Sequence, residues 1–279
     1  MSQQNKGLAV VTGASSGIGA VYADRLARRG HDLLLIARNR DRLQQVAAEI
    51  ARRTGRKVEV LVSDLSVPAD LARVERVLRD DPRITVLVNN AGLGAVAPLL
   101  DTNPDDMSRM ISLNVDALMR LTHAVAPAFV SRGSGTIVNI ASIVAVGPEI
   151  LNGVYGATKA FVLAFSQSLR KELADKGVRV QVVLPGATAT DFWSIAGRPV
   201  EHLPQEIVMT ADDLVDAALA GLDQGEFATI PALPDIEQWN AWEGARQALL
   251  PNLSRSVPAG RYAPSPGRGN NDAAGEPVE

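Results

Sequence analysis

Short runs of apolar residues alternate along the chain with longer stretches in which apolar and polar positions are mixed as on the faces of a helix. Several runs are apolar almost throughout, which is typical of strands buried on both faces of a parallel sheet. The predicted strands are Leu8–Val11, Asp32–Ile36, Val58–Val62, Thr85–Val88, Thr136–Ile140, Val178–Leu184 and Phe227–Ile230. The predicted helices are Ala20–Arg29, Arg42–Arg53, Asp70–Arg79, Met107–Val130 and Val154–Asp175, with a further helix after Thr210.

This alternation predicts the fold class. Right-handed crossovers bring successive strands into one parallel sheet and place helices on both of its faces. We therefore expect an α/β fold with a single doubly wound parallel sheet of about seven strands. No period of roughly 20–50 residues repeats, which argues against a solenoid.

The pattern weakens after Pro185 and Gly186. Residues 187–209 contain no clear strand, and we expect them to close over a ligand as a lid. The predicted domain runs from residue 1 to 255 and includes this lid. Residues 256–279 hold four prolines and four glycines but one aromatic residue, Tyr262, so they are expected to form a disordered tail.

Composition excludes several kinds of chemistry. Apolar residues make up 46% of the chain, which is enough for a full core, and the net charge of −3 argues against a nucleic-acid partner. The chain has no cysteine, so thiolate metal sites and a thiol nucleophile are excluded, and the three histidines lack metal-ligand spacing. We expect no metal site. The N-terminus lacks the apolar region of a signal peptide, and we expect a soluble, cytoplasmic protein without membrane contact.

A glycine-rich turn follows the first predicted strand and opens the first helix. It reads Thr12-Gly-Ala-Ser-Ser-Gly-Ile-Gly19. Glycines permit a tight turn and a close backbone approach, so a pyrophosphate can meet the N–H groups and the positive end of the helix. A glycine turn alone is a weak signal, but its place between strand and helix in an α/β pattern favours nucleotide binding.

The end of the second strand bears on which dinucleotide binds. NAD sites usually place a carboxylate there to hold the ribose 2′-OH, whereas this chain has Arg38. The planar guanidinium matches a 2′-phosphate, so NADP(H) is the predicted cofactor and NAD(H) the alternative. The alternative interpretation is that Arg38 is a solvated arginine at the start of the next helix. Asp64 ends the third strand and is expected either to accept from the adenine amino group or to cap the next helix.

Tyr155 and Lys159 stand four residues apart, on one face of a predicted helix. One positive charge at roughly 4 Å, in an effective dielectric near 20, lowers the pKa of a phenol by up to about three units. That shift brings a tyrosine toward the range of a useful acid/base. Ser142 ends the fifth strand, where its hydroxyl can bond the same substrate oxygen. As an isolated pattern, this tyrosine–lysine spacing is mostly structural.

Taken together, the motifs resemble those of the short-chain dehydrogenases/reductases, in their shorter branch. The matching segments, in family order over residues 7 to about 230, are TGASSGIG at 12–19, Asp64, NNAG at 89–92, Asn114, Ser142, YGATK at 155–159 and PGATAT at 185–190. The resemblance implies a Rossmann-type fold and an oxidoreductase that moves a hydride between a nicotinamide and a carbonyl or secondary alcohol. It also implies a homodimer or homotetramer, although the apolar helix faces can equally pack on the chain's own sheet.

The resemblance implies four catalytic residues. Tyr155 exchanges the proton, Ser142 orients the carbonyl, Lys159 lowers the tyrosine pKa and bonds the nicotinamide ribose, and Asn114 holds a water that relays protons to Lys159. Asn89 is expected to brace neighbouring strands. The cofactor contacts expected from the motifs are Gly13, Ser15, Ser16, Gly17, Ile18, Gly19, Arg38, Asp64, Leu65, Asn90, Ala91, Gly92, Tyr155, Lys159, Pro185, Gly186, Thr188 and Thr190.

One position departs from the family pattern. Many NADP-using members carry a basic residue just before the middle glycine of the loop, where this chain has Ser16. Arg38 must then supply most of the phosphate recognition.

The expected substrate region lies mainly in residues 93–100, 143–152 and 187–209, and it is apolar. Its residues include Leu93, Val96, Ile143, Val144, Val146, Phe192 and Trp193. They suggest an uncharged, partly hydrophobic carbonyl compound. Two other functions remain open. One is a sugar-nucleotide epimerase or dehydratase, which usually has a larger C-terminal substrate domain; the other is a catalytically inactive NADP(H)-binding sensor or scaffold.

Overall fold

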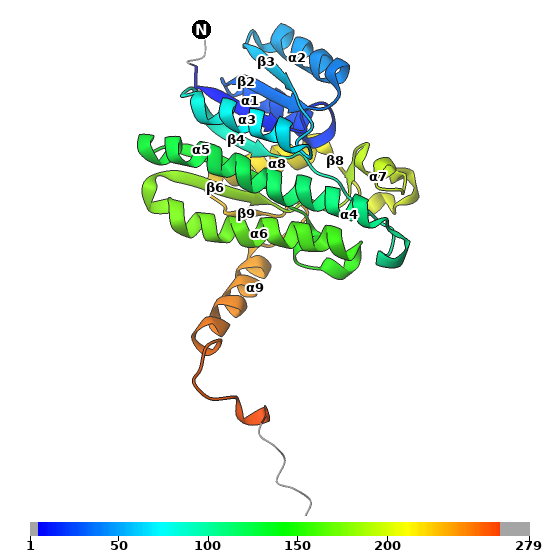
Figure 1. The fold of residues 1–279 in the computed structure, drawn as a ribbon, viewed down its shortest axis with the longest axis vertical. Helices are drawn as coiled ribbons and strands as arrows, with labels where there is room; N and C mark the ends of the chain where they lie inside the picture. Colours follow the sequence, from blue (N-terminus) through cyan, green and yellow to red (C-terminus); the bar gives the residue numbers. More distant parts are fainter. Residues whose placement is uncertain (1–4, 263–279) are drawn as a thin grey trace, which may run out of the picture. The chain divides into compact units, whose positions relative to one another are not determined.

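The computed structural model describes residues 5–262, and the described chain divides into two compact units between Ala232 and Leu233. Within the described residues, the first unit carries the sheet and the eight α-helices α1 to α8 (Figure 1). The second contains α9 (Ile236–Leu249) and the short turns Leu250–Asn252 and Gly260–Tyr262. The predicted domain of residues 1–255 spans both units and stays a prediction. Most of the predicted tail, residues 263–279, lies outside the described residues.

Seven strands form one parallel sheet in the order β3-β2-β1-β4-β5-β6-β9. This confirms the predicted doubly wound architecture, in which the strand order reverses between β1 and β4. The strands are β1 (Leu8–Thr12), β2 (Asp32–Ala37), β3 (Val58–Val62), β4 (Ile84–Asn89), β5 (Gly135–Ile140), β6 (Val178–Val183) and β9 (Ala228–Thr229). Each predicted strand is present within about two residues of its expected ends.

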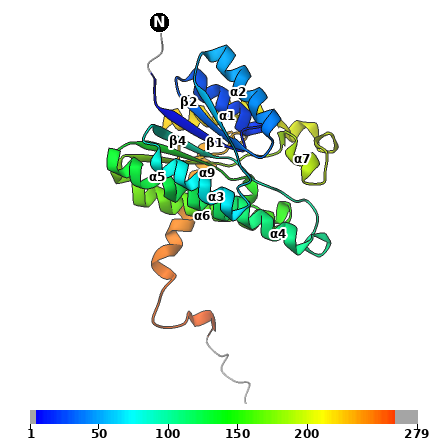
Figure 2. The same ribbon diagram turned by 45° about the horizontal axis from the view of Figure 1, so that its top comes forward.

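Helices cover both faces of this sheet (Figures 1 and 2). Those that pack on one face are α1 (Gly17–Arg28), α2 (Arg40–Thr54) and α8 (Ala211–Gln224). Those on the other face are α3 (Pro68–Asp80), α5 (Leu118–Arg132) and α6 (Gly153–Leu173). α4 (Pro104–Ile111) precedes α5 and contacts α6.

Alternate residues of the first strand show why the sheet needs two helical layers. Ala9 and Val11 belong to the core under α1, α2 and α8, while Leu8 and Val10 belong to the core under α3, α5 and α6. All five residues of β1 are buried. The near-continuous apolar run in the sequence therefore reflects burial on both faces.

The helix predicted at residues 107–130 is longer and less regular than expected. α4 and α5 are joined by a π-helical segment, Ser112–Ala117, which inserts wider turns into the helix. Asn114 lies in this segment. No helix among residues 5–262 is long and apolar enough to cross a membrane.

The segment between residues 187 and 209 contains short elements that the sequence did not predict. β7 (Thr188–Ala189) pairs with β8 (Met209–Thr210), so both ends of the segment are tied together. Between them lie α7 (Phe192–Ile195) and two short turns, Val200–His202 and Gln205–Ile207. This closed loop lies beside the carboxyl edge of the sheet, and its residues line a cavity there.

Candidate active site

The glycine-rich turn leaves the first turn of α1 open to a ligand. α1 begins at Gly17, and the side chain of Ser16, its N-cap, makes no capping hydrogen bond. The first turn contains no acidic residue, so its free N–H groups and the positive end of the helix dipole are available to an anion. Gly13 and Gly17 have φ of +65° and +52°, which only glycine adopts without strain. These features fit a dinucleotide pyrophosphate.

A cavity of about 830 Å³ opens at the carboxyl edge of the sheet. This volume is typical of small-molecule pockets, which measure roughly 300–1,000 Å³. Of the residues predicted to bind cofactor or act in catalysis, those that line the cavity are Gly13, Ser15, Ser16, Gly17, Ile18, Arg38, Asp64, Leu65, Asn90, Ala91, Gly92, Ser142, Tyr155, Lys159, Pro185, Gly186, Thr188 and Thr190. Gly19 and Asn114 do not line it.

Two predicted cofactor contacts are used within the protein. A methyl group on Gly19 would overlap the carbonyl of Gly13, so this glycine lets α1 approach the turn closely. The Asn90 amide donates to the carbonyls of Thr12 at 2.9 Å and Gly13 at 3.2 Å, which fixes the shape of the turn. Both residues therefore shape the glycine turn.

Asn89 braces the sheet, as predicted. Its amide nitrogen donates to Asn139 Oδ1 at 2.9 Å and to Thr122 Oγ1 at 3.0 Å. These bonds connect β4 to β5 and to α5 within the core.

Tyr155 and Lys159 lie one turn apart at the start of α6, as the spacing predicts. Asn152 begins this helix by accepting hydrogen bonds from the backbone N–H groups of Val154 and Tyr155. The Lys159 ammonium donates to the carbonyl of Ile140 at 2.9 Å and lies 5.8 Å from the centre of the Tyr155 ring. Both side chains are buried and line the cavity.

The electrostatics of this pair differ from the sequence expectation. Burial raises the pKa of Tyr155 to about 12, although a hydrogen bond with Ser142 acts in the opposite direction. Burial lowers the pKa of Lys159 to about 8. The predicted lowering of the tyrosine pKa by Lys159 is therefore not seen. Desolvation of the phenolate is the largest cause of the shift, and the Ser142 hydrogen bond opposes it. The phenol is therefore protonated at neutral pH.

Ser142 follows the end of β5 and lies beside Tyr155 in the cavity. Its hydroxyl lies at the end of β5, donates to the Pro185 carbonyl at 3.3 Å and accepts from the Val144 N–H at 3.4 Å. Both bonds are long, so they leave the hydroxyl able to bond a ligand. Ser142 and Tyr155 therefore present two hydroxyls to one place in the cavity.

Asn114 positions the chain after β4. Its carboxamide accepts from the Leu93 N–H and donates to the Leu93 carbonyl, both at 2.8 Å, and donates to Thr158 Oγ1 at 3.0 Å. A methyl group on Gly92 would lie 3.2 Å from Asn114 Oδ1 and 3.6 Å from Lys159 Nζ, which shows how closely these groups approach. The role of Asn114 in a proton relay stays a prediction.

Three charged side chains meet at the outer end of the cavity. Arg38 is half-exposed and lies 3.9 Å from the Asp64 carboxylate, which also pairs with Arg109 at 3.4 Å. Asp64 does not cap the next helix, because α3 begins later and its N-cap is Val67. Its Oδ1 instead accepts from the backbone and hydroxyl of Ser66. The guanidinium of Arg38 is thus at the edge of the cavity, where it can meet a phosphate.

A second arginine at this end was not predicted from the sequence. Arg42 lines the cavity in the first turn of α2 and forms an ion pair with Asp191 at 2.7 Å. Arg42 stands four residues after Arg38, so both arginines lie near the start of α2. This spacing was the sequence signal that could have identified Arg42. Asp191 precedes α7, so the pair joins the cofactor end of the cavity to the closed loop at 187–209.

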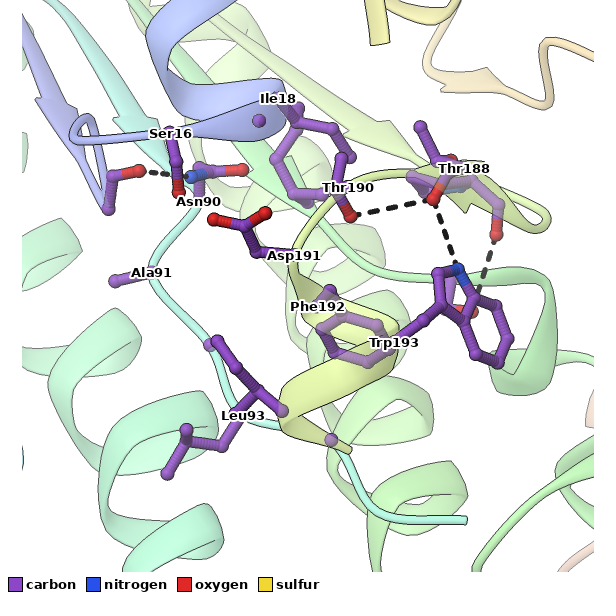
Figure 3. A pocket seen from close by; sticks show the side chains of 18 of the residues that line it. Ser16, Ile18, Asn90, Ala91, Leu93, Thr188, Thr190, Asp191, Phe192 and Trp193 are labelled. Atoms are coloured by element: carbon purple, nitrogen blue, oxygen red, sulfur yellow. Dashed lines mark hydrogen bonds between the residues drawn. The ribbon is translucent and has the colours of Figure 1, made fainter. Parts of the chain in front are cut away.

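The opposite end of the cavity is apolar. The ring centres of Phe192 and Tyr155 lie 5.7 Å apart. Trp193, next to Phe192, donates from Nε1 to the Thr188 carbonyl at 3.0 Å (Figure 3). A methyl group on Gly94 would overlap the Phe192 ring, so the absence of a side chain there makes room for it.

The predicted substrate residues are mostly in place. Leu93, Ile143, Val144, Phe192 and Trp193 line the cavity, whereas Val96 and Val146 do not. Apolar lining residues that were not predicted from the sequence include Leu113, Ile150, Leu151, Ile195, Leu203 and Ile207. Most of these lie in the segments 143–152 and 187–209. The sequence predicted that these segments contact substrate, but it did not identify these individual residues.

Comparison with known proteins gives the same picture. The model of the short chain dehydrogenase family matches residues 7–198. Very-long-chain 3-oxoacyl-CoA reductase of Anas platyrhynchos is 38% identical over 192 residues, which are 67% of this chain. That match spans 62% of the length of the duck reductase.

Solved structures match over more of the chain. A short-chain dehydrogenase from Sphingobium yanoikuyae, in complex with NADPH, is 50% identical with a TM-score of 0.89, over 92% of this chain and 99% of that one. The bulky-bulky ketone specific alcohol dehydrogenase from Comamonas testosteroni is 44% identical with a TM-score of 0.86, over 94% of this chain and 100% of that one.

Proposed function

Because the chain belongs to the short-chain dehydrogenase family, we propose that it is an NADP(H)-dependent oxidoreductase acting on a carbonyl or secondary alcohol, with Tyr155 as acid/base. The observation that carries this proposal is the meeting of Tyr155, Ser142 and Lys159 in the cavity that the glycine turn opens. A protein that only binds nucleotide needs no such set of groups beside the nicotinamide end.

The reaction proceeds by transfer of a hydride and a proton. When bound, NADPH supplies the hydride that adds to the carbonyl carbon. Tyr155 donates its phenolic proton to the carbonyl oxygen, which becomes the hydroxyl of the product. Ser142 holds that oxygen by a hydrogen bond. The positive charge of Lys159 stabilises the phenolate that remains, until a proton from solvent restores it.

The raised pKa of Tyr155 favours the reductive direction. A pKa of about 12 keeps the phenol protonated at neutral pH, which is the form that reduction needs. Oxidation of an alcohol needs the phenolate, and this form is scarce in the free protein.

NADP(H) is supported by the charge at the outer end of the cavity. Arg38 and Arg42 both line it there, and a 2′-phosphate brings two negative charges that a guanidinium matches in shape. The relative from Sphingobium yanoikuyae is described in complex with NADPH, which supports the same choice.

The substrate we propose is an uncharged, bulky ketone. Phe192, Ile143 and Val144 pack with Tyr155, and Trp193 lines the same cavity. The similarity to a bulky-bulky ketone specific alcohol dehydrogenase supports this class. We also propose that the loop 187–209 acts as a lid and that the chain forms a homodimer or homotetramer.

The test is NADPH oxidation with a panel of aldehydes, small ketones, aryl ketones and keto acids, followed at 340 nm, with NADH in parallel. Turnover of aryl ketones that is lost in Tyr155→Phe supports the proposal. Clear preference for small anionic keto acids contradicts the substrate class. Tight NADPH binding with no turnover of any carbonyl supports the alternative, a sensor or scaffold without catalysis.

A further inference from the structure

A second cavity lies at the opposite edge of the sheet from the active site. It has a volume of about 420 Å³ and is enclosed by the amino ends of β4, β5 and β6 and by the C-terminal halves of α1 and α8. We call it the amino-edge cavity. Its apolar walls come from Leu26, Val88, Leu219 and Leu222. Its volume falls within the range of pockets that hold small molecules.

A fully buried phenol borders this cavity without a hydrogen-bond partner. The Tyr22 side chain has no exposed surface, and its hydroxyl finds no partner among the described residues. A buried hydroxyl left unpaired costs roughly 1–3 kcal/mol, so such groups are normally satisfied. Burial raises the pKa of Tyr22 well above its usual value, against the opposing charge of Arg29, so the phenol is a permanent donor.

A second polar atom in the same cavity is also unpaired. The Nδ1 atom of His31 is buried and has no partner in the described part of the chain. Burial, and next the charge of Lys6, lower the pKa of His31 to about 4, so its imidazole is neutral at physiological pH. The imidazole also forms a hydrogen bond with the backbone of Gly7, so its Nδ1 is an acceptor. The unpaired donor that a ligand in this cavity completes is therefore the Tyr22 hydroxyl.

The charged groups around the cavity are mostly positive. Lys6, Arg29 and Arg179 line it, against one carboxylate, Asp223, which Arg29 holds through two hydrogen bonds of 2.9 Å. Lys6 and Arg179 have no ion-pair partner within residues 5–262. The C-termini of α1 and α8 each contribute roughly half a negative charge, which leaves the balance positive.

We propose that the amino-edge cavity binds a small carboxylate with an apolar body. The carboxylate accepts a hydrogen bond from the Tyr22 hydroxyl and is attracted by Lys6, Arg29 and Arg179. The apolar body packs against the leucine and valine walls. This site is separate from the cofactor cavity and does not depend on the proposed reaction.

Calorimetry tests the proposal with benzoate as the probe and methyl benzoate as its uncharged counterpart. Titrations are made on the full-length protein saturated with NADPH, so that the cofactor end of the active-site cavity is filled. We expect benzoate to bind with one-to-one stoichiometry, and at least tenfold more weakly in Tyr22→Phe and in Lys6→Gln/Arg179→Gln. Tyr22→Phe keeps the ring and loses a hydroxyl that has no partner, so it should fold.

Matched controls separate the site from general charge effects. Tyr262→Phe removes an exposed hydroxyl, and Arg52→Gln removes an exposed guanidinium on α2, and neither should change the affinity for benzoate. Methyl benzoate should bind at least tenfold more weakly than benzoate to the unaltered protein.

A crystal soaked in 4-bromobenzoate locates the probe. An anomalous bromine peak between α1 and α8, with the carboxylate beside Tyr22, supports the proposal. Ordered water alone in the cavity overturns it, as does a peak confined to the active site. Affinity unchanged by Tyr22→Phe also overturns it. A bromine peak without heat of binding in solution means binding at crystal concentration only, and this outcome counts against the proposal too.

Discussion

The ammonium of Lys159 and the ring of Tyr155 lie 5.8 Å apart, and the same ammonium is held by the last carbonyl of β5, that of Ile140. The lysine is thereby fixed beside the phenol at the edge of the sheet instead of extending into solvent. Both side chains are buried, so each charge that forms there is felt strongly by the other.

Tyr155→Phe should abolish turnover and leave the cofactor site intact. The substitution removes the only group that we assign to proton transfer, and general acid catalysis is worth roughly 10²–10⁴ in rate. We expect a fall in kcat of at least about a thousandfold. NADPH affinity, measured by fluorescence titration, should change less than about threefold, which is below 1 kcal/mol. Tyr262→Phe, at an exposed tyrosine, is the control; a near-normal kcat in Tyr155→Phe would refute the assigned acid.

Lys159→Met should inactivate the protein but stabilise its fold at neutral pH. Burial holds the pKa of Lys159 at about 8, below the 10.5 of an unfolded chain. Below pH 8 the lysine is charged in both states, and burying that charge costs about 3 kcal/mol. Allowing for the lost hydrogen bond, the melting temperature at pH 7 should rise by about 5 °C.

The pH dependence of this gain gives the decisive check. Between about pH 8 and 10.5 the folded state releases the lysine proton while the unfolded state keeps it, so the cost of burial disappears. The advantage of Lys159→Met in melting temperature should therefore shrink across this range. Lys171→Met, at an exposed lysine of the same helix, should give no advantage at any pH, and a pH-independent gain at residue 159 would contradict the charge argument.

The rate of ketone reduction should fall as the pH rises through about 8. Reduction needs a protonated Tyr155, with a pKa of about 12, and a charged Lys159, with a pKa of about 8. The lysine therefore titrates first. Measured from pH 6 to 10, kcat/KM for NADPH should lose roughly tenfold per unit above pH 8, because this constant reports the groups of the free protein. An increase in rate through pH 8 would assign the limiting proton to another group.

Arg38→Gln should weaken NADPH binding and leave NADH binding unchanged. The guanidinium lies at the edge of the cavity, 3.9 Å from Asp64, where it can meet the 2′-phosphate. A hydrogen bond to a charged group contributes about 1.5–3 kcal/mol, so the Kd for NADPH should rise roughly 10–150-fold. Arg40→Gln alters an exposed arginine that does not line the cavity and is the control. An equal loss for both cofactors would show that Arg38 acts elsewhere.

Gly94→Ala should raise KM for large ketones. A methyl group there overlaps the Phe192 ring, so the ring must move within the apolar end of the cavity. We expect KM for an aryl ketone to rise about tenfold, the range found for small steric changes in apolar pockets, with NADPH affinity unchanged. Gly244→Ala, where a methyl group meets nothing, serves as the control. Unchanged KM values would mean that Phe192 does not contact substrate.

The positions of the strands could be predicted closely, because a strand buried on both faces is apolar at nearly every position. β1 is apolar at every position before Thr12, and the structure buries all five of its residues. The π-helical segment around Asn114 could not be predicted, because one wider turn in a helix changes hydrogen-bond partners without changing the apolar pattern. β7 and β8 were missed because two-residue strands carry too little pattern to detect.

The candidate site could be predicted from motifs, but its electrostatics could not. Spacing placed Tyr155 and Lys159 on one helix face, and the structure agrees. The pKa of Tyr155 depends on how far the fold buries it, which no four-residue spacing reveals. The pair Arg42–Asp191 joins residues 149 positions apart, so only the folded chain brings it together.

Because the start of α1 is uncapped, the stability of the folded protein depends on its cofactor. Ser16 leaves the first N–H groups of this helix without a side-chain partner, so a bound pyrophosphate satisfies groups that the free protein leaves to water. A ligand that binds only the folded state shifts the unfolding equilibrium in proportion to the logarithm of its concentration. A fall in the cofactor pool would therefore open more of the chain to proteases, and its abundance would follow the nucleotide supply.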